Sequence, residues 1–117
     1  MKVYGLGLKG EQIATRFLKR KGFKVLETNF QCRFGEIDLI ARDKSCLVFC
    51  EVRTRGAGAL VPPLESVTYA KQQKLIKTAR FYLQLHQLDT EARFDVVAVT
   101  AEPDGRFTVE HLENAFS

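Results

Sequence analysis

The chain has 117 residues, of which 45% are hydrophobic, and 18 Lys and Arg against 14 Asp and Glu leave a net charge of +4. This length suits a single domain, so we expect one domain over residues 1–117. The composition argues against disorder, and no apolar run approaches the roughly 18 residues of a membrane span. Residues 1–10 also lack the apolar stretch of a secretory signal, so the expected compartment is the cytoplasm, with no membrane association.

Residues 10–21 have the pattern of an amphipathic helix. Their apolar arc consists of Ile13, Ala14, Phe17 and Leu18. Glu11 borders this arc, and the basic side chains face the other way. Gly22 is a suitable C-terminal stop for the helix.

The glycine-rich string Gly5-Leu6-Gly7-Leu8-Lys9-Gly10 matches the G-x-G-x-x-G pattern of dinucleotide-binding loops. Only four residues precede it, so no strand can lead into the turn that such a loop requires. We therefore interpret it as a flexible entry to the first helix.

Three strands are expected next, over residues 23–32, 36–42 and 46–53, with a turn at Asp43-Lys44-Ser45 between the last two. A loop with two Gly and two Pro over residues 54–65 leads to a second helix. That helix is capped by Ser66 or Thr68 and runs to about Gln87.

Two further strands complete the chain. Residues 92–100 are mostly apolar, Asp104-Gly105 is typical of a hairpin turn, and Phe107 to Glu110 predicts a short edge strand. The order α-β-β-β-α-β-β predicts an α/β fold in which a mixed sheet is flanked by helices.

Two acidic positions stand inside runs that otherwise read as buried strands, Asp38 in Gly35–Ile40 and Glu51 in Val48–Arg53. A turn centred between Lys44 and Ser45 sets Asp38 opposite Glu51, about 4.5–5.5 Å away. Carboxylates this close repel each other unless a cation lies between them, and hard oxygen ligands suit Mg²⁺ or Mn²⁺. A register shift of one residue would separate the pair.

Other interpretations of these acids stay open. Asp38 and Glu51 can be paired with Arg53 and Lys71 without any metal. Glu36 is either a solvated strand end or part of the site. Glu11 is either a surface residue or a group that reaches the metal through water.

Lys71 and Gln72 project within the apolar arc of the second helix, near its start. A lysine and a glutamine that face a sheet require polar partners, which carboxylates or a phosphate would provide. The alternative for Lys71 is that its apolar methylene groups pack on the protein while its amine reaches solvent.

The basic residues are unevenly distributed. Residues 2–33 carry a net charge of +6 and residues 53–80 of +5, whereas residues 81–117 carry −5. This asymmetry favours an anionic partner, although solvated helix faces explain it equally well. Three cysteines and two histidines lack zinc-ligand spacing, so we expect buried, reduced thiols.

Several strings together resemble the YraN family of small, poorly characterised bacterial proteins. They are Gly10-Glu11, Gly35-Glu36-Ile37-Asp38-Leu39-Ile40, Phe49-Cys50-Glu51-Val52-Arg53, Ser66-Val67-Thr68, Lys71-Gln72 and Arg93-Phe94-Asp95-Val96-Val97. The resemblance covers roughly residues 5–115. That family is similar in turn to the restriction-endonuclease-like superfamily and, within it, to archaeal Holliday-junction resolvases.

The superfamily pattern is a helical Glu, an Asp on one strand and Glu-x-Lys on the next. The resemblance therefore implies a restriction-endonuclease-like fold with a metal-dependent phosphodiesterase site. Asp38, Glu51 and the Val52 carbonyl would hold Mg²⁺ or Mn²⁺, and Glu11 would anchor a water. Arg53 and Lys71 would hold the scissile phosphate, with Gln72 orienting a neighbour.

Arg53 departs from the lysine of that pattern. Arginine stays protonated at physiological pH, so it can stabilise charge on a phosphate but cannot act as a base. A metal would then have to lower the pKa of the attacking water.

The residues and the resemblance together predict a metal-dependent endonuclease that acts on DNA. We expect it to recognise the shape of the DNA, such as branches or flaps. We expect phosphate contacts from Lys19, Arg20, Arg55, Lys74 and Lys77. By analogy with junction-cutting relatives, which need two sites, a homodimer is plausible. The competing hypotheses are a non-catalytic nucleic-acid-binding module with the same fold, and a protein-interaction domain with solvated basic faces.

Overall fold

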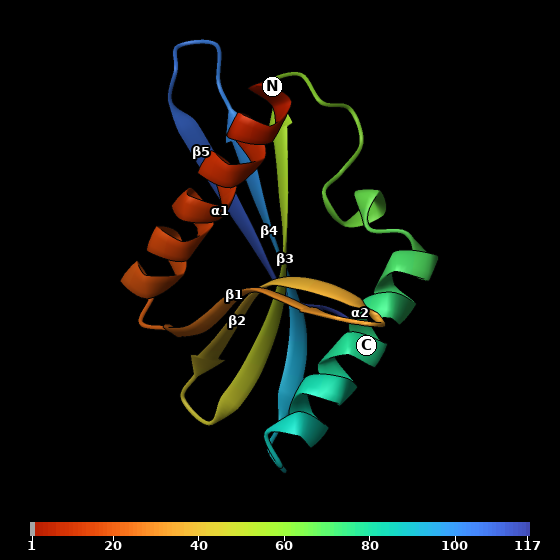
Figure 1. The fold of residues 1–117 in the computed structure, drawn as a ribbon. Helices are drawn as coiled ribbons and strands as arrows, with labels where there is room; N and C mark the ends of the chain where they lie inside the picture. Colours follow the sequence, from red (N-terminus) through yellow and green to blue (C-terminus); the bar gives the residue numbers. More distant parts are fainter. Residues whose placement is uncertain (1) are drawn as a thin grey trace.

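A five-stranded mixed sheet carries one helix on each face in the computed structural model, which describes residues 2–117 and the side chains of residues 9–117 (Figure 1). The elements in chain order are α1 (Lys2–Arg20), β1 (Lys24–Cys32), β2 (Gly35–Asp43), β3 (Cys46–Gly56), the 3-10 turn η1 (Leu64–Ser66), α2 (Tyr69–Leu85), β4 (Ala92–Ala101) and β5 (Phe107–Phe116). This confirms the predicted α/β class and the order α-β-β-β-α-β-β.

The strands lie side by side in chain order. β1, β2 and β3 form an antiparallel meander, and β5 pairs antiparallel with β4. β3 and β4 are parallel, so the chain needs a long crossover between them, and α2 provides it. The mixed sheet therefore follows from a single helical connection.

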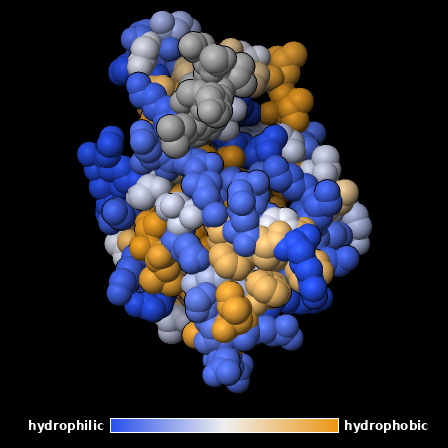
Figure 2. Space-filling model, viewed as in Figure 1, coloured by the Kyte–Doolittle hydropathy of each residue, from blue (hydrophilic) through white to orange (hydrophobic). Residues whose placement is uncertain are grey.

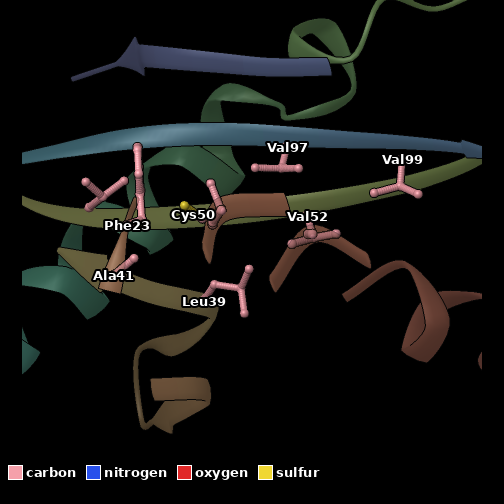
Figure 3. Packing of buried hydrophobic residues seen from close by; sticks show 10 residues of the cluster. Phe23, Leu39, Ala41, Cys50, Val52, Val97 and Val99 are labelled. Carbon is pink, nitrogen blue, oxygen red and sulfur yellow. The ribbon is translucent and has the colours of Figure 1, made fainter. Parts of the chain in front are cut away.

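Each helix buries its apolar side against a different face of the sheet. On the α1 face, Ala14 and Leu18 join a buried cluster with strand residues that include Leu39, Cys50 and Val52 (Figure 3). On the α2 face, Leu75, Ala79 and Tyr82 pack with strand residues that include Ile40 and Phe49. Buried apolar area on both faces stabilises the fold and holds both helices against the strands that carry the acidic residues.

α1 begins at Lys2, eight residues before the predicted start, so the interpretation of Gly5–Gly10 as a flexible entry was wrong. The helix backbone continues through the glycines. At Gly10 the missing side chain has a packing reason, because a Cβ there would overlap the Thr54 hydroxyl on β3. Glycine thus lets α1 approach β3 closely.

Tertiary pairing also lengthens two strands beyond their predicted ends. β3 continues to Gly56 because every residue from Leu47 to Gly56 pairs with β4. β5 extends to Phe116, whose ring stacks on Phe94 with centroids 5.0 Å apart. The second helix begins after Thr68, whose hydroxyl accepts a hydrogen bond from the Lys71 N–H, so Thr68 and not Ser66 is its cap.

Within residues 2–117, no helix is long and apolar enough to cross a membrane.

Candidate functional site

The register between β2 and β3 is the one that the sequence predicts. Asp43 pairs with Cys46 and Leu39 with Cys50 across a turn in which Lys44 has φ 57°. Extending this register by one residue sets Asp38 opposite Glu51. The two carboxylates that follow the last paired residues, Asp38 and Glu51, line the same pocket, so the predicted register and the nearness of the two acids are confirmed.

The ladder between β2 and β3 ends at the pair Leu39–Cys50, one residue before Asp38 and Glu51 would meet. The Val52 N–H donates to Asp38 Oδ2 at 2.8 Å, so a side chain takes the place of a ladder carbonyl. Leu39 packs on the α1 face whereas Ile37 packs on the α2 face, so the usual alternation along β2 is interrupted here. Figure 1 shows the β1–β2 hairpin crossing toward α2. We infer that the divergence of β2 from β3 opens the space beside Asp38.

A pocket of about 400 Å³ occupies this space. Four elements line it, with residues Glu11 from α1, Glu36 and Asp38 from β2, Glu51, Val52, Arg53 and Thr54 from β3, and Lys71 from α2. We call it the acidic pocket. It brings together six of the seven residues assigned to the site from the sequence.

Gln72 is the exception. Its Nε2 donates to the Val67 carbonyl at 3.1 Å and so braces the turn that leads into α2. It does not line the acidic pocket. The position of Gln72 on the helical arc correctly predicted that its side chain faces inward. Its hydrogen-bond partner is a nearby backbone carbonyl and not a group of the site.

Glu51 is ion-paired to two cations. Its side chain is 5% exposed, and Oε2 lies 2.7 Å from Lys71 Nζ and 3.2 Å from Arg53 Nη1. The metal-free pairing that the sequence left open is thus present for Glu51. Asp38 instead receives the Val52 N–H, a neutral donor.

Asp38 has an unusually high pKa, raised from 3.8 to about 7. Burial is the largest cause, followed by the negative charge of Glu51, and Glu11 adds to the repulsion. The hydrogen bond from Val52 opposes the shift. A carboxyl that is half protonated near neutral pH marks a place where additional positive charge would be favourable.

Arg53 uses both sides of its guanidinium. Nη1 contacts Glu51, and Nε donates to Ser66 Oγ at 3.1 Å. Ser66 Oγ in turn donates to the Pro63 carbonyl at 2.6 Å. A lysine could not bridge the two directions at once, so arginine at this position links the acidic pocket to the loop before α2.

The donor set suits a hard dication held by few protein ligands. In the described part of the chain, no group of three or more His, Cys, Asp or Glu side chains is arranged to hold a metal ion. Mg²⁺ commonly uses one or two carboxylates and keeps several waters. Asp38 and Glu51 can provide two carboxylates, and the repulsion that raises the Asp38 pKa is what such an ion would relieve.

The predicted phosphate contacts are spread over the molecule. Arg55 is held by Thr100 Oγ1 and by the Val61 carbonyl, at 3.3 and 2.7 Å. Lys74, together with Lys71 and Glu36, lines a neighbouring pocket of about 620 Å³. Lys77 lies farther along α2, and Lys19 and Arg20 are exposed at the end of α1. Lys74 is thus the predicted contact that the structure puts beside the acidic pocket.

Sequence reasoning missed Thr54, which lines the acidic pocket and abuts Gly10. The available signal was Gly10 itself, since a glycine inside a helical pattern can allow close approach of the backbone to another group. The role of Asp95 was also not foreseen.

Asp95 is fully buried but belongs to a separate network. Arg93 Nε and the Asn114 N–H donate to its Oδ1 at 3.0 and 2.9 Å, and His111 Nε2 lies 2.8 Å from Oδ2. Burial alone would raise its pKa, but these hydrogen bonds lower it below its usual value. Asp95 therefore stays ionised and ties β4 to β5.

Comparisons with known proteins agree on one family. The family model described as "Uncharacterised protein family UPF0102", the YraN family, matches residues 10–99. A UPF0102 protein of Pelobacter propionicus is 45% identical over 113 residues, covering 94% of this chain and 81% of that protein. One from Geobacter metallireducens is 47% identical over 113 residues, covering 95% and 91%. One from Marinobacter nauticus is 44% identical over 111 residues, covering 94% and 90%.

Proposed function

This chain belongs to the uncharacterised protein family UPF0102, and we propose that it is a Mg²⁺- or Mn²⁺-dependent phosphodiesterase that cleaves DNA, with branched DNA as the preferred form. The observation that carries the proposal is the acidic pocket itself. Asp38 and Glu51 share it with Glu11, Arg53 and Lys71, although these residues come from four different elements.

Asp38 and Glu51 would hold the dication, which when bound supplies Lewis-acid polarisation of a phosphoryl oxygen and of the attacking water. Asp38 keeps its orientation because the Val52 N–H fixes Oδ2. A carboxylate has further lone pairs beyond this one hydrogen bond, so it can still act as a ligand. Glu11, across the pocket on α1, would accept a hydrogen bond from a bound water.

Arg53 and Lys71 would bind the phosphate. Both now contact Glu51 Oε2, and both remain partly exposed, at 32% and 43%. A dication at Glu51 would take over the neutralisation of that carboxylate. The two cationic side chains could then turn toward the negative charge that grows on the phosphate during the reaction.

Cleavage of a branched DNA and of a duplex with the same sequence tests the proposal. We expect product with Mn²⁺ or Mg²⁺, none in EDTA, and loss of cleavage in Asp38→Asn and in Glu51→Gln. Glu110→Gln, which changes an exposed acid on β5, is the matched control and should cut like the parent. Metal-independent cleavage, or full activity in Asp38→Asn, would contradict the proposal.

One observation favours a second candidate, a non-catalytic nucleic-acid-binding module. The Lys71–Glu51–Arg53 ion pairs already neutralise Glu51 without a metal. In that case the parent and both carboxylate variants would bind DNA alike, with affinity falling steeply as salt increases, and none would cut.

A further inference from the structure

The segment from the end of β3 to the first residue of α2 presents several exposed apolar side chains. Leu60 is 94% exposed, Val61 54%, Leu64 38% and Tyr69 75%. We call these four residues the apolar lip. Apolar atoms project from the upper right of the molecule in Figure 2, where Figure 1 draws the loop that follows β3. Four exposed apolar side chains within ten residues of the chain make this segment a candidate site of interaction.

The apolar lip stands on a braced loop. Arg55 Nη1 donates to the Val61 carbonyl at 2.7 Å, and Ala57 N–H donates to Ala101 O at 2.9 Å. Pro62 and Pro63 restrict the backbone, and η1 follows them directly. These contacts tie residues 57 and 61 to β3 and β4, so the loop that exposes Leu60 is fixed at both of these points.

The same loop is connected to the acidic pocket. Arg53 contacts Glu51 with one nitrogen and Ser66 with another, and Ser66 lies in η1 beside Leu64. Lys71 lies two residues after Tyr69 and lines the pocket. The apolar lip is therefore flanked by the cations that would meet a phosphate backbone.

Apolar side chains beside cations suit a nucleic acid whose bases are unpaired. Nucleobases stack on aromatic or apolar side chains while the backbone tracks along positive charge. Wedges of this kind also enter DNA at distorted steps. A dimer interface is a poorer match, because a stable interface takes roughly 20–30 residues a side and the apolar lip has four.

We propose that the apolar lip packs against an unpaired nucleobase at the branch point of DNA bound at the acidic pocket. This inference rests on the proposed function and names the feature that selects branched over fully paired DNA. The lip contacts the base, and the pocket holds the adjacent phosphate.

The test uses a DNA junction with 2-aminopurine at an unpaired branch position, and a duplex with the same base. Binding is measured in EDTA by 2-aminopurine fluorescence and by titration. The parent is compared with Leu60→Ser/Val61→Ser, with Tyr69→Ala, and with the control Leu85→Ser/Leu88→Ser. Leu85, the last residue of α2, is 56% exposed and Leu88, three residues after it, is 41% exposed, so the control removes similar apolar groups elsewhere.

We expect the parent and the control to change the junction fluorescence at least twofold. The lip variants should lose that change and bind the junction about five- to a hundredfold more weakly, with duplex binding altered less than twofold. Equal fluorescence changes in parent and lip variants, or none in the parent, would overturn the inference. A dimeric parent and a monomeric lip variant by light scattering, with junction binding unchanged, would assign the lip to self-association instead.

Cleavage with Mn²⁺ is measured in parallel to separate the two proposals. A lip-dependent fluorescence change without any cleavage would leave the base contact standing and reject the phosphodiesterase. If the parent shows no fluorescence change and the lip variants cleave as well as the parent, the phosphodiesterase proposal stands and the base contact is rejected.

Discussion

Lys71 Nζ on α2 lies 2.7 Å from Glu51 Oε2 on β3, so one ion pair joins the crossover helix to the strand that precedes it. The glutamate is 5% exposed whereas the lysine is 43% exposed. Leaving the glutamate unpaired therefore costs more free energy than leaving the lysine unpaired, because a buried charge cannot regain water but an exposed one can.

This asymmetry predicts that loss of the lysine destabilises the protein more than loss of the glutamate. Lys71→Met leaves a buried carboxylate with Arg53 as its remaining cation, and we expect a loss of about 1–2 kcal/mol of unfolding free energy. Glu51→Gln should cost less, because Lys71 can turn to water. Urea denaturation in EDTA measures both, with Lys77→Met as the exposed control. The reverse order would contradict the ion-pair interpretation.

The raised pKa of Asp38 predicts that ionisation of this carboxyl lowers the free energy of unfolding in a pH-dependent way. Between pH about 4 and 7 the folded protein retains a proton that the unfolded chain has released, so stability falls as pH rises through this window and levels off above it. Asp38→Asn should remove the penalty. Its stabilisation should be near zero at pH 4 and at most about 4 kcal/mol at pH 8.

Denaturation of parent and Asp38→Asn at pH 4, 6 and 8 in EDTA measures this. Asp104→Asn, at an exposed turn, is the control. A stabilisation that is the same at pH 4 and pH 8 would show that the carboxyl does not titrate as described.

Divalent metal should stabilise the protein through the same carboxylates. A ligand present at ten to a hundred times its Kd adds about 1.4–2.7 kcal/mol. We expect MnCl₂ to raise Tm in the parent and not in Asp38→Asn. Because the proton on Asp38 must leave before an ion binds, affinity should increase between pH 6 and 8 and level off above the pKa of about 7. CaCl₂ and KCl scans show whether the shift reflects ionic strength.

The close approach of α1 to β3 at Gly10 is expected to position Glu11 at the acidic pocket, and a substitution can test this. Gly10→Ala would add a Cβ that overlaps Thr54 Oγ1, so α1 must move and carry Glu11 with it. We expect a loss of about 1–3 kcal/mol together with weaker Mn²⁺ stabilisation. Thr54→Ala should partly rescue it, because the hydroxyl is the nearest atom. Gly56→Ala meets nothing within 4 Å and is the control.

Arg53→Lys would introduce the lysine of the superfamily pattern that the sequence resembles, but it would remove one of two contacts. A lysine can pair with Glu51 or reach Ser66, not both. We expect faster hydrogen exchange of the amides of η1, including Ser66, with little change in the sheet. Arg106→Lys, on the exposed β4–β5 turn, is the matched control. Unchanged exchange in η1 would show that Arg53 does not brace the loop.

Much of the site was accessible from the sequence because its elements are local. A short turn between Asp43 and Cys46 sets the β2–β3 register, and that register is enough to oppose Asp38 and Glu51. Apolar periodicity likewise gave both helices and their inward faces. Gln72 shows the limit of periodicity. Its inward direction was predicted correctly, but its observed partner is the Val67 carbonyl and not a carboxylate or a phosphate.

The amino-acid order by itself determined the α/β class, the antiparallel pair that carries the two acids and the family resemblance, because alternation, turns and helical arcs depend on neighbours along the chain. Tertiary structure alone decided the length of β5, the close approach of α1 at Gly10, the raised pKa of Asp38 and the exposure of Leu60. Each of these depends on burial and contacts between distant segments, and no local pattern records which segments meet.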